Sequence, residues 1–409
     1  MRPVLVSLHR WFGLAAALFL FIAGATGAVI SWDHELDEWL NPQLYQARTA
    51  GTPLAPLELA ARIERDDPRV RVTFMPLAVE PGHAFVASVS PRVDPATGKL
   101  FEPGYNQVAL DPATGETQGR REWGKVSLTR ENLLPFLYKL HYTMHIPDGW
   151  GIEFGMWFMG LIGIAWVLDT LIALWISFPN WRQWRRSFAF RWQDGGHKLT
   201  FDLHRSGAMW IYLLVLVLAV TSVAMNLRDQ VVRPVVSWFS ELSPSPFASR
   251  TPTAPERAIE PTIDATRAIE LARAEARHRG VDAAPGGLFL SPEFGVWGVG
   301  FYDVANSHGD GGLGNPWIYL DARTGAPAGA SIPGTGSAGD IFLQSMFPLH
   351  SGRIIGLPGR VLMSLMGAMV AMLCVTGVLI WARKRKARER AMRPAPTGRA
   401  ALGAAQAAR

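Results

Sequence analysis

Residues 8–32 of this 409-residue chain read LHRWFGLAAALFLFIAGATGAVISW, a histidine followed by an apolar run long enough to cross a bilayer. The triplet LHR returns at residues 203–205 before another apolar run, and LH at residues 140–141 and 349–350 precedes two more. The four runs cover residues 11–32, 154–178, 209–227 and 361–381. Because a titratable ring is costly at membrane depth, histidines repeated in register on four apolar segments indicate a bound ligand.

The composition is typical of a membrane protein with sizeable water-facing parts, since 49% of the residues are hydrophobic while 18% are charged. Basic residues gather in the short segment 182–198 and in residues 383–390, after the fourth run. By the positive-inside rule both segments are cytoplasmic, which predicts a multi-pass protein of the bacterial inner membrane with both termini in the cytoplasm. The net charge of +6 therefore reflects topology, and we expect no nucleic-acid partner.

The two long segments between runs resemble each other. Each has a helical pattern, at residues 57–65 and 264–278, followed by short alternating strands, and each ends in a turn motif, DPATG at 111–115 and DARTG at 321–325. The predicted strands are 70–74, 84–89 and 106–110 in the first segment, and 287–290, 296–302 and 317–320 in the second. The sequence predicts a membrane α-helical fold: a four-helix transmembrane bundle built from two parallel repeats, with two α+β domains on the outer side.

The predicted organisation follows the chain in order. It comprises residues 1–40 as span one with a cytoplasmic N-terminus, 41–134 as the first outer domain, 135–180 as span two, 181–203 as a basic and aromatic cytoplasmic loop that lies on lipid headgroups, 204–232 as span three, 233–344 as the second outer domain, 345–383 as span four and 384–409 as a basic cytoplasmic tail.

A pseudo-twofold axis between the repeats would place the histidines in facing pairs. It sets His9 opposite His204 near the cytoplasmic face, and His141 opposite His350 near the outer face. Two facing imidazoles are the bis-axial arrangement of an electron-transfer haem. The single cysteine, Cys374, excludes a CxxC attachment, so we expect two haem groups of the b type.

Each histidine of the inner pair is followed by an arginine. Arg10 and Arg205 are candidates to pair with a haem propionate, although a role as positive-inside anchors is the alternative. Asp169 interrupts the second run and is either a proton relay or a helix–helix hydrogen bond, to Thr170 or to a basic residue.

The outer ligand is less sharply defined. His141 and His145 are spaced i, i+4, so either side chain could meet His350. His34 is a surface histidine or, with His145, an alternate ligand of an extra haem. The histidines without repeat partners are expected to be ordinary polar positions: His83, His197, His278 and His308.

Several motifs together resemble the PepSY-associated transmembrane family across nearly the whole chain. They are HRW at residues 9–11, ELDEWLNP at 35–42, LHYTMH at 140–145, DLHR at 202–205, LHSG at 349–352, TG at 376–377 and Trp381. The resemblance implies an inner-membrane protein with PepSY-like periplasmic domains, linked to iron acquisition. Relatives of this kind include b-haem reductases of ferric siderophores.

The sequence thus favours a di-haem b oxidoreductase that reduces a ferric siderophore in the periplasm, with a cytoplasmic flavoprotein or quinol as electron donor. The chain has no nucleotide-binding glycine fingerprint of its own. The competing hypothesis is a non-enzymatic PepSY membrane module that binds or regulates a periplasmic partner. A permease is a third hypothesis, disfavoured by the expectation of four unbroken spans.

Overall fold

The structure, a computed structural model, describes residues 1–392, so the predicted cytoplasmic tail is covered only in its first part. The chain forms two compact units. The first comprises Met1–Gly24, Ala165–Leu216 and the chain from Ala368 onward, and the second comprises Ala25–Ile164 and Val217–Gly367.

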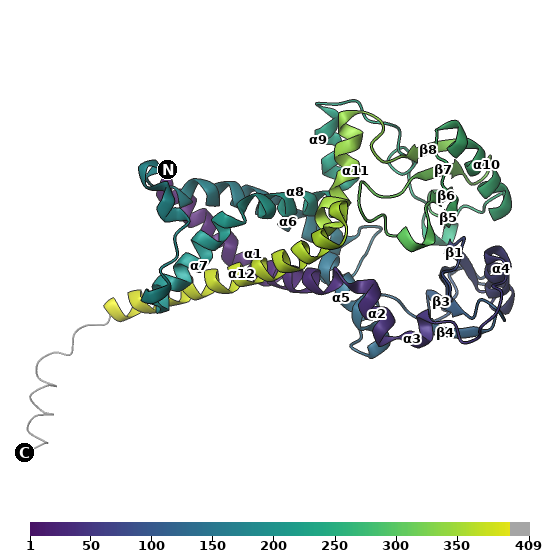
Figure 1. Ribbon diagram of the computed structural model, residues 1–409, viewed down its shortest axis with the longest axis horizontal. Helices are drawn as coiled ribbons and strands as arrows, with labels where there is room; N and C mark the ends of the chain where they lie inside the picture. The colour runs from purple at the N-terminus through teal and green to yellow at the C-terminus, as the bar shows by residue number, and fades with distance from the viewer. Residues whose placement is uncertain (393–409) are drawn as a thin grey trace, which may run out of the picture. The chain divides into compact units, whose positions relative to one another are not determined.

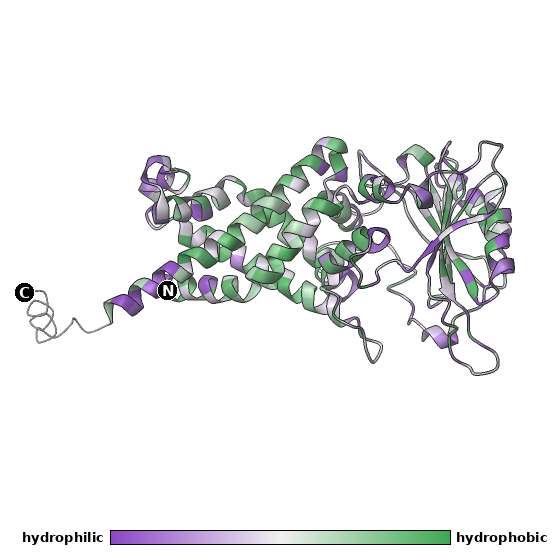
Figure 2. Cartoon of the chain, turned by 90° about the horizontal axis from the view of Figure 1, so that it is seen from below, coloured by the Kyte–Doolittle hydropathy of each residue, from purple (hydrophilic) through white to green (hydrophobic). Residues whose placement is uncertain are grey.

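Three helices are long and apolar enough to cross a membrane. They are α1 (Arg2–Ile30), α6 (Phe154–Ser177) and α12 (Leu357–Ala391), and a fourth span is present if the bent pair α7 (Gly196–Trp210) and α8 (Tyr212–Asn226) counts as one. Figure 2 shows these helices coloured mostly hydrophobic. Leucines on them remain exposed, as a lipid-facing surface requires: Leu18, Leu161, Leu213 and Leu365.

The expectation of four unbroken spans is wrong for the third. Its two helices meet at a bend of 73°. The polar half, α7, is tied to the preceding loop, which holds the short helices η2 (Trp181–Ser187) and η3 (Trp192–Asp194). Asp202 accepts from Arg191 at 2.7 Å, and the Ser206 hydroxyl donates to the carbonyl of Ala189. Because these bonds tie α7 to the preceding loop, the break by itself does not indicate a transport site.

The strands of the two outer segments form one sheet and not two. The order of this antiparallel sheet is β4-β3-β2-β1-β5-β6-β7-β8, so each segment contributes one half. The halves join where β1 pairs with β5, with Phe74 opposite Phe289 and Pro76 opposite Gly287. The strands are β1 (Val70–Pro76), β2 (Phe85–Pro91), β3 (Gln107–Leu110), β4 (Thr117–Arg121), β5 (Pro285–Ser291), β6 (Val296–Phe301), β7 (Trp317–Asp321) and β8 (Pro327–Ser331).

One helix from each half packs on the sheet. Figure 1 shows α4 (Pro56–Asp66) beside the first four strands and α10 (Ala265–His278) beside the last four. Small side chains at Ala268, Ala272 and Ala276, one turn apart, are fully buried and let α10 approach closely. The largest fully buried side chains of this core include Phe85 and Phe301.

Short helices connect the sheet to the spans. They are α2 (Asp33–Leu40), α3 (Pro42–Tyr45), α5 (Leu133–Thr143), α9 (Arg233–Ser237) and α11 (Ala338–Ser351), with η1 (Arg130–Asn132), the π-helical turn η4 (Arg228–Val232), η5 (Pro255–Arg257), η6 (Val304–Asn306) and η7 (Arg353–Ile355). A buried ion pair fixes α2 to β4, since Arg121 donates to Asp37 at 2.6 Å. Asn41 and Tyr45 also donate to this carboxylate.

Candidate functional site

The structure brings His9 and His204 together in the first unit. His9 lies on α1 and His204 on α7, with ring centroids 6.1 Å apart and planes tilted by 50°. The Nδ1 atom of His9 lies 3.0 Å from both carboxylate oxygens of Asp169, on α6. Because the carboxylate accepts the Nδ1–H, the Nε2 lone pair of His9 is available to a metal.

His204 is oriented by α12. Its Nδ1 lies 3.0 Å from the carbonyl of Leu373 and 3.2 Å from the hydroxyl of Thr376. The ring also packs on Gly377, where a Cβ would come within 3.1 Å of the His204 Cε1. A carbonyl can only accept, so His204 carries its proton on Nδ1 and also presents an Nε2 lone pair.

His141 and His350 form an equivalent pair in the second unit. Their centroids are 6.1 Å apart and their planes are tilted by 59°. The hydroxyl of Thr26 on α1 lies 3.2 Å from Nδ1 of His141, and the hydroxyl of Thr221 on α8 lies 3.0 Å from Nδ1 of His350. The site therefore depends on threonines that the sequence did not single out.

One spacing in the sequence could have identified these threonines. The interval from His9 to Thr26 equals the interval from His204 to Thr221. Helix α1 and the bent pair α7 and α8 thus each carry a histidine of the inner pair and a threonine that contacts a histidine of the outer pair.

Capping residues at both ends define α11, the helix that carries His350. Ser337 and Asp340 form a capping box at its start, and the helix ends at Gly352, whose φ is +76°. A Cβ at Gly352 would lie 2.2 Å from the carbonyl oxygen of Gly359, so only glycine fits there. This explains the glycine of the LHSG motif.

Both pairs have the spacing that haem iron requires. An imidazole nitrogen binds a transition metal at about 2.0–2.1 Å and lies about 1.1 Å from its ring centre, so two axial imidazoles have centroids roughly 6.3 Å apart. The observed separation of 6.1 Å in each pair fits this value. Within residues 1–392 no group of three or more His, Cys, Asp or Glu side chains is arranged to hold a metal ion.

Each arginine beside the inner pair has a buried hydrogen-bond donor without a partner. The Nε atoms of Arg10 and Arg205 are both buried without a hydrogen-bond partner. Their other contacts are weak or exposed: Arg10 donates to the Ser7 hydroxyl at 3.2 Å, and Arg205 to the carbonyl of Arg186 at 2.5 Å. A buried, unsatisfied donor on a cation fits an anionic group such as a haem propionate.

His145 does not face His350. Helix α5 ends at Thr143, and Met144 and His145 both have a left-handed backbone with φ of +53°. The i, i+4 relation to His141 is therefore lost before His145 is reached. Its ring instead stacks on Phe136 at 4.6 Å, with Nε2 2.9 Å from the Phe136 carbonyl.

His34 also lies apart from His145. Its ring contacts His308 at a centroid distance of 5.1 Å and meets the edge of Tyr45 at 5.8 Å. His308 was expected to be an ordinary polar residue because it has no repeat partner, but its ring lies against that of His34. No periodic signal marks it, because it lies in an irregular glycine-rich loop.

Asp169 makes a hydrogen bond between helices, which is one of the two roles expected for it, but with a different partner. That partner is His9. Thr170 instead donates to the carbonyl of Trp166 within its own helix.

A comparison with protein families gives one match. The family model described as PepSY-associated TM region matches residues 6–384. No curated protein matches the chain.

Proposed function

The chain belongs to the PepSY-associated TM region family, and on that premise we propose that it is a di-haem b electron-transfer protein of the bacterial inner membrane that reduces ferric siderophores. Electrons would enter at the His9/His204 pair from a cytoplasmic flavoprotein or quinol and leave at the His141/His350 pair. Both termini would then be cytoplasmic and the sheet periplasmic.

One observation carries the proposal: two histidine pairs have the same centroid separation of 6.1 Å, and all four Nδ1 atoms have hydrogen-bond partners. The Nδ1 contacts restrain the orientation of each ring, and the acceptors at the Nδ1 atoms of His9 and His204 favour the tautomer with a lone pair on Nε2. A structural histidine pair has no need of such matched geometry.

Haem b, when bound, supplies the one-electron couple. The two histidines of each pair would hold it, which would suit electron transfer. Arg10 and Arg205 would neutralise propionates at the inner pair. The product of reduction, ferrous iron, is less suited than ferric iron to hard oxygen chelators, so the chelate would release it.

Haem stoichiometry tests the proposal. We expect the purified chain, expressed with ample haem, to have a dithionite-reducible b-type spectrum and two haems. Alanine at His9, His204, His141 or His350 should remove one haem, while His145→Ala is a matched control that keeps both, because His145 faces Phe136. Purified protein with no b-type spectrum would instead favour the non-enzymatic PepSY module.

A further inference from the structure

A pocket of about 290 Å³ opens beside His350 in the second unit. Ala224 and Met225 of α8, one turn beyond Thr221, form one wall, and Met346 and Phe347 of α11, one turn before His350, form another. No lining residue comes from α1 or α5, the helices that carry Thr26 and His141. The pocket therefore lies beside His350 and is not the space between the two histidine rings.

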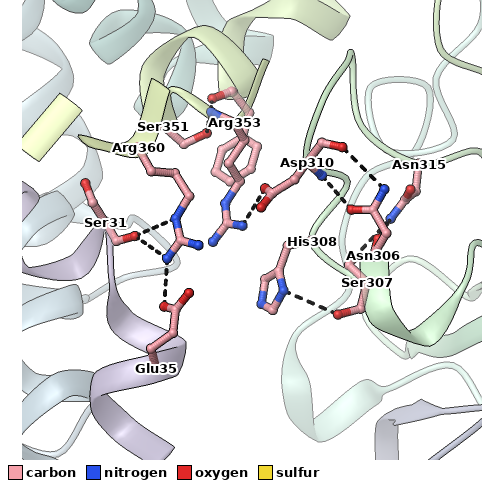
Figure 3. Close-up of polar contacts among 11 residues, drawn as sticks. Ser31, Glu35, Asn306, Ser307, His308, Asp310, Asn315, Ser351, Arg353 and Arg360 are labelled. Atoms are coloured by element: carbon pink, nitrogen blue, oxygen red, sulfur yellow. Dashed lines mark hydrogen bonds and ion pairs between the residues drawn. The ribbon is translucent and has the colours of Figure 1, made fainter. Parts of the chain in front are cut away.

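The third wall is a shaped loop, residues 307–315. Figure 3 shows its hydrogen bonds: Asn315 donates to the carbonyls of Asn306 and Ser307, and the backbone of Asp310 donates to the Asn306 side chain at 2.8 Å. Arg353, at the start of η7, holds the loop, since its side chain pairs with Asp310 at 2.7 Å. The loop is thus preformed, as ligand pockets usually are.

The charge of the pocket is positive. Arg228 lines it, and none of its described lining residues is Asp or Glu. Nearby arginines are each neutralised by an acid: Arg353 by Asp310, Arg360 by Glu35 and Arg233 by Asp229.

Arg228 differs from these arginines. In the part of the chain that the structure describes, its exposed side chain makes neither a hydrogen bond nor an ion pair, and it stands two residues after the end of α8. Neutral polar groups at Ser307, Asn315 and Gln344 surround the same space. An unpaired cation among neutral polar groups suits a carboxylate.

We infer that this pocket binds the carboxylate arm of a small polycarboxylate ferric chelate. This inference rests on the proposed function, and it narrows the substrate class. A volume of about 290 Å³ is at the lower end of the range for ligand pockets, roughly 300–1,000 Å³. It has room for one arm of a hydroxycarboxylate chelate and is too small to enclose a whole tris-hydroxamate complex.

Binding of gallium(III) citrate, which cannot be reduced by the protein, tests the inference. Calorimetric titration of the full haem-loaded chain in detergent should give saturable binding. Arg228→Gln should weaken it by about tenfold or more, because it removes a hydrogen bond to a charged group. Arg233→Gln is the matched control, since Arg233 lies on the next turn, is already paired with Asp229 and is outside the pocket.

Two results would overturn the inference: no saturable binding by the wild-type chain, or Arg228→Gln binding as tightly as wild type. A gallium tris-hydroxamate that competes fully with gallium citrate would also contradict it. The proposed function is judged separately, by the b-type spectrum and by oxidation of the dithionite-reduced haems when a ferric chelate is added. If the chain passes those two tests but binds no gallium citrate, only the pocket assignment is refuted. If it binds gallium citrate but contains no haem, only the reductase proposal is refuted.

Discussion

Asp169 holds Nδ1 of His9 at 3.0 Å with both carboxylate oxygens, while the repeat partner His204 has only a carbonyl and a hydroxyl at its Nδ1. The two members of the inner pair therefore differ in their electrostatic support. A carboxylate behind an imidazole makes the ring a stronger donor to a metal.

Asp169→Asn is expected to weaken the inner site. Loss of the negative charge should raise the reduction potential of the inner haem and lower its affinity by about 10–100-fold, the usual effect of removing such a partner. A spectroelectrochemical titration measures both haems in one sample. Thr170→Val is the control, because the Thr170 hydroxyl donates to the Trp166 carbonyl of its own helix and not to His9. A potential identical to wild type would show that Asp169 does not act through His9, and unchanged turnover with a quinol donor would exclude a proton relay.

Gly27→Val is expected to empty the outer site. A Cβ at Gly27 would lie 3.0 Å from Cε1 of His141, so a branched side chain must push the ring away from His350. We expect one haem per chain in place of two, measured by a pyridine haemochrome assay. Gly13→Val is the matched control, because a Cβ there meets nothing within 4 Å. Two haems in Gly27→Val would contradict the assignment of His141.

Asp37→Ala is expected to destabilise the chain strongly. The mutation leaves Arg121, whose side chain is 2% exposed, without its carboxylate. An uncompensated buried charge costs about 3–5 kcal/mol, so the apparent Tm should fall clearly. Asp66→Ala removes an exposed ion pair with Arg65 and should change Tm little. Equal effects of the two mutations would refute this account of the ELDEWLNP motif.

We expect the folded chain to become less stable at acidic pH, because Asp111 and Asp321 in the two matching turns become protonated. Burial opposes ionisation of Asp111, but donors from Thr49, Thr114 and Ala113 lower its pKa from 3.8 to about 2. The pKa of Asp321 is likewise lowered to about 2, against the effect of burial, by donors from Thr324 and Arg250. A depressed pKa stabilises the folded state above the unfolded value, and this contribution is lost as pH falls from about 4 to about 2.

Circular dichroism of the chain in detergent measures this loss. Asp321→Asn should reduce the decline in Tm between about pH 5 and pH 2.5, since one of the two groups no longer titrates. Asp66→Asn, at an exposed position, should leave the decline unchanged. A wild-type Tm that is constant over this interval would contradict the role of the turns.

Much of the sheet could be predicted because its central strands alternate. The predicted strands at 70–74 and 296–302 match β1 and β6 within two residues. β4, with sequence TQGRR, and β8, with sequence PAGAS, were missed because neither has an apolar alternation. Their conformation is set by pairing with β3 and β7.

The sequence repeat predicted the histidine pairs, but it did not decide whether His141 or His145 lies opposite His350. Pro147 indicates that a helix ends near this point, but no glycine or asparagine stands at Met144, so the left-handed backbone that turns His145 away could not be placed from the sequence. The bend of the third span has the same origin, because hydrogen bonds to distant loop residues decide it. Such tertiary contacts have no local sequence pattern.

The pairing of β1 with β5 also determines the order of assembly. These strands come from opposite halves of the chain, so the sheet cannot close until most of the chain has been synthesised. His141 emerges early and His350 late, and neither alone supplies a bis-imidazole site. The outer histidine pair can therefore form only late in synthesis, and a chain truncated before residue 350 should contain at most the inner pair.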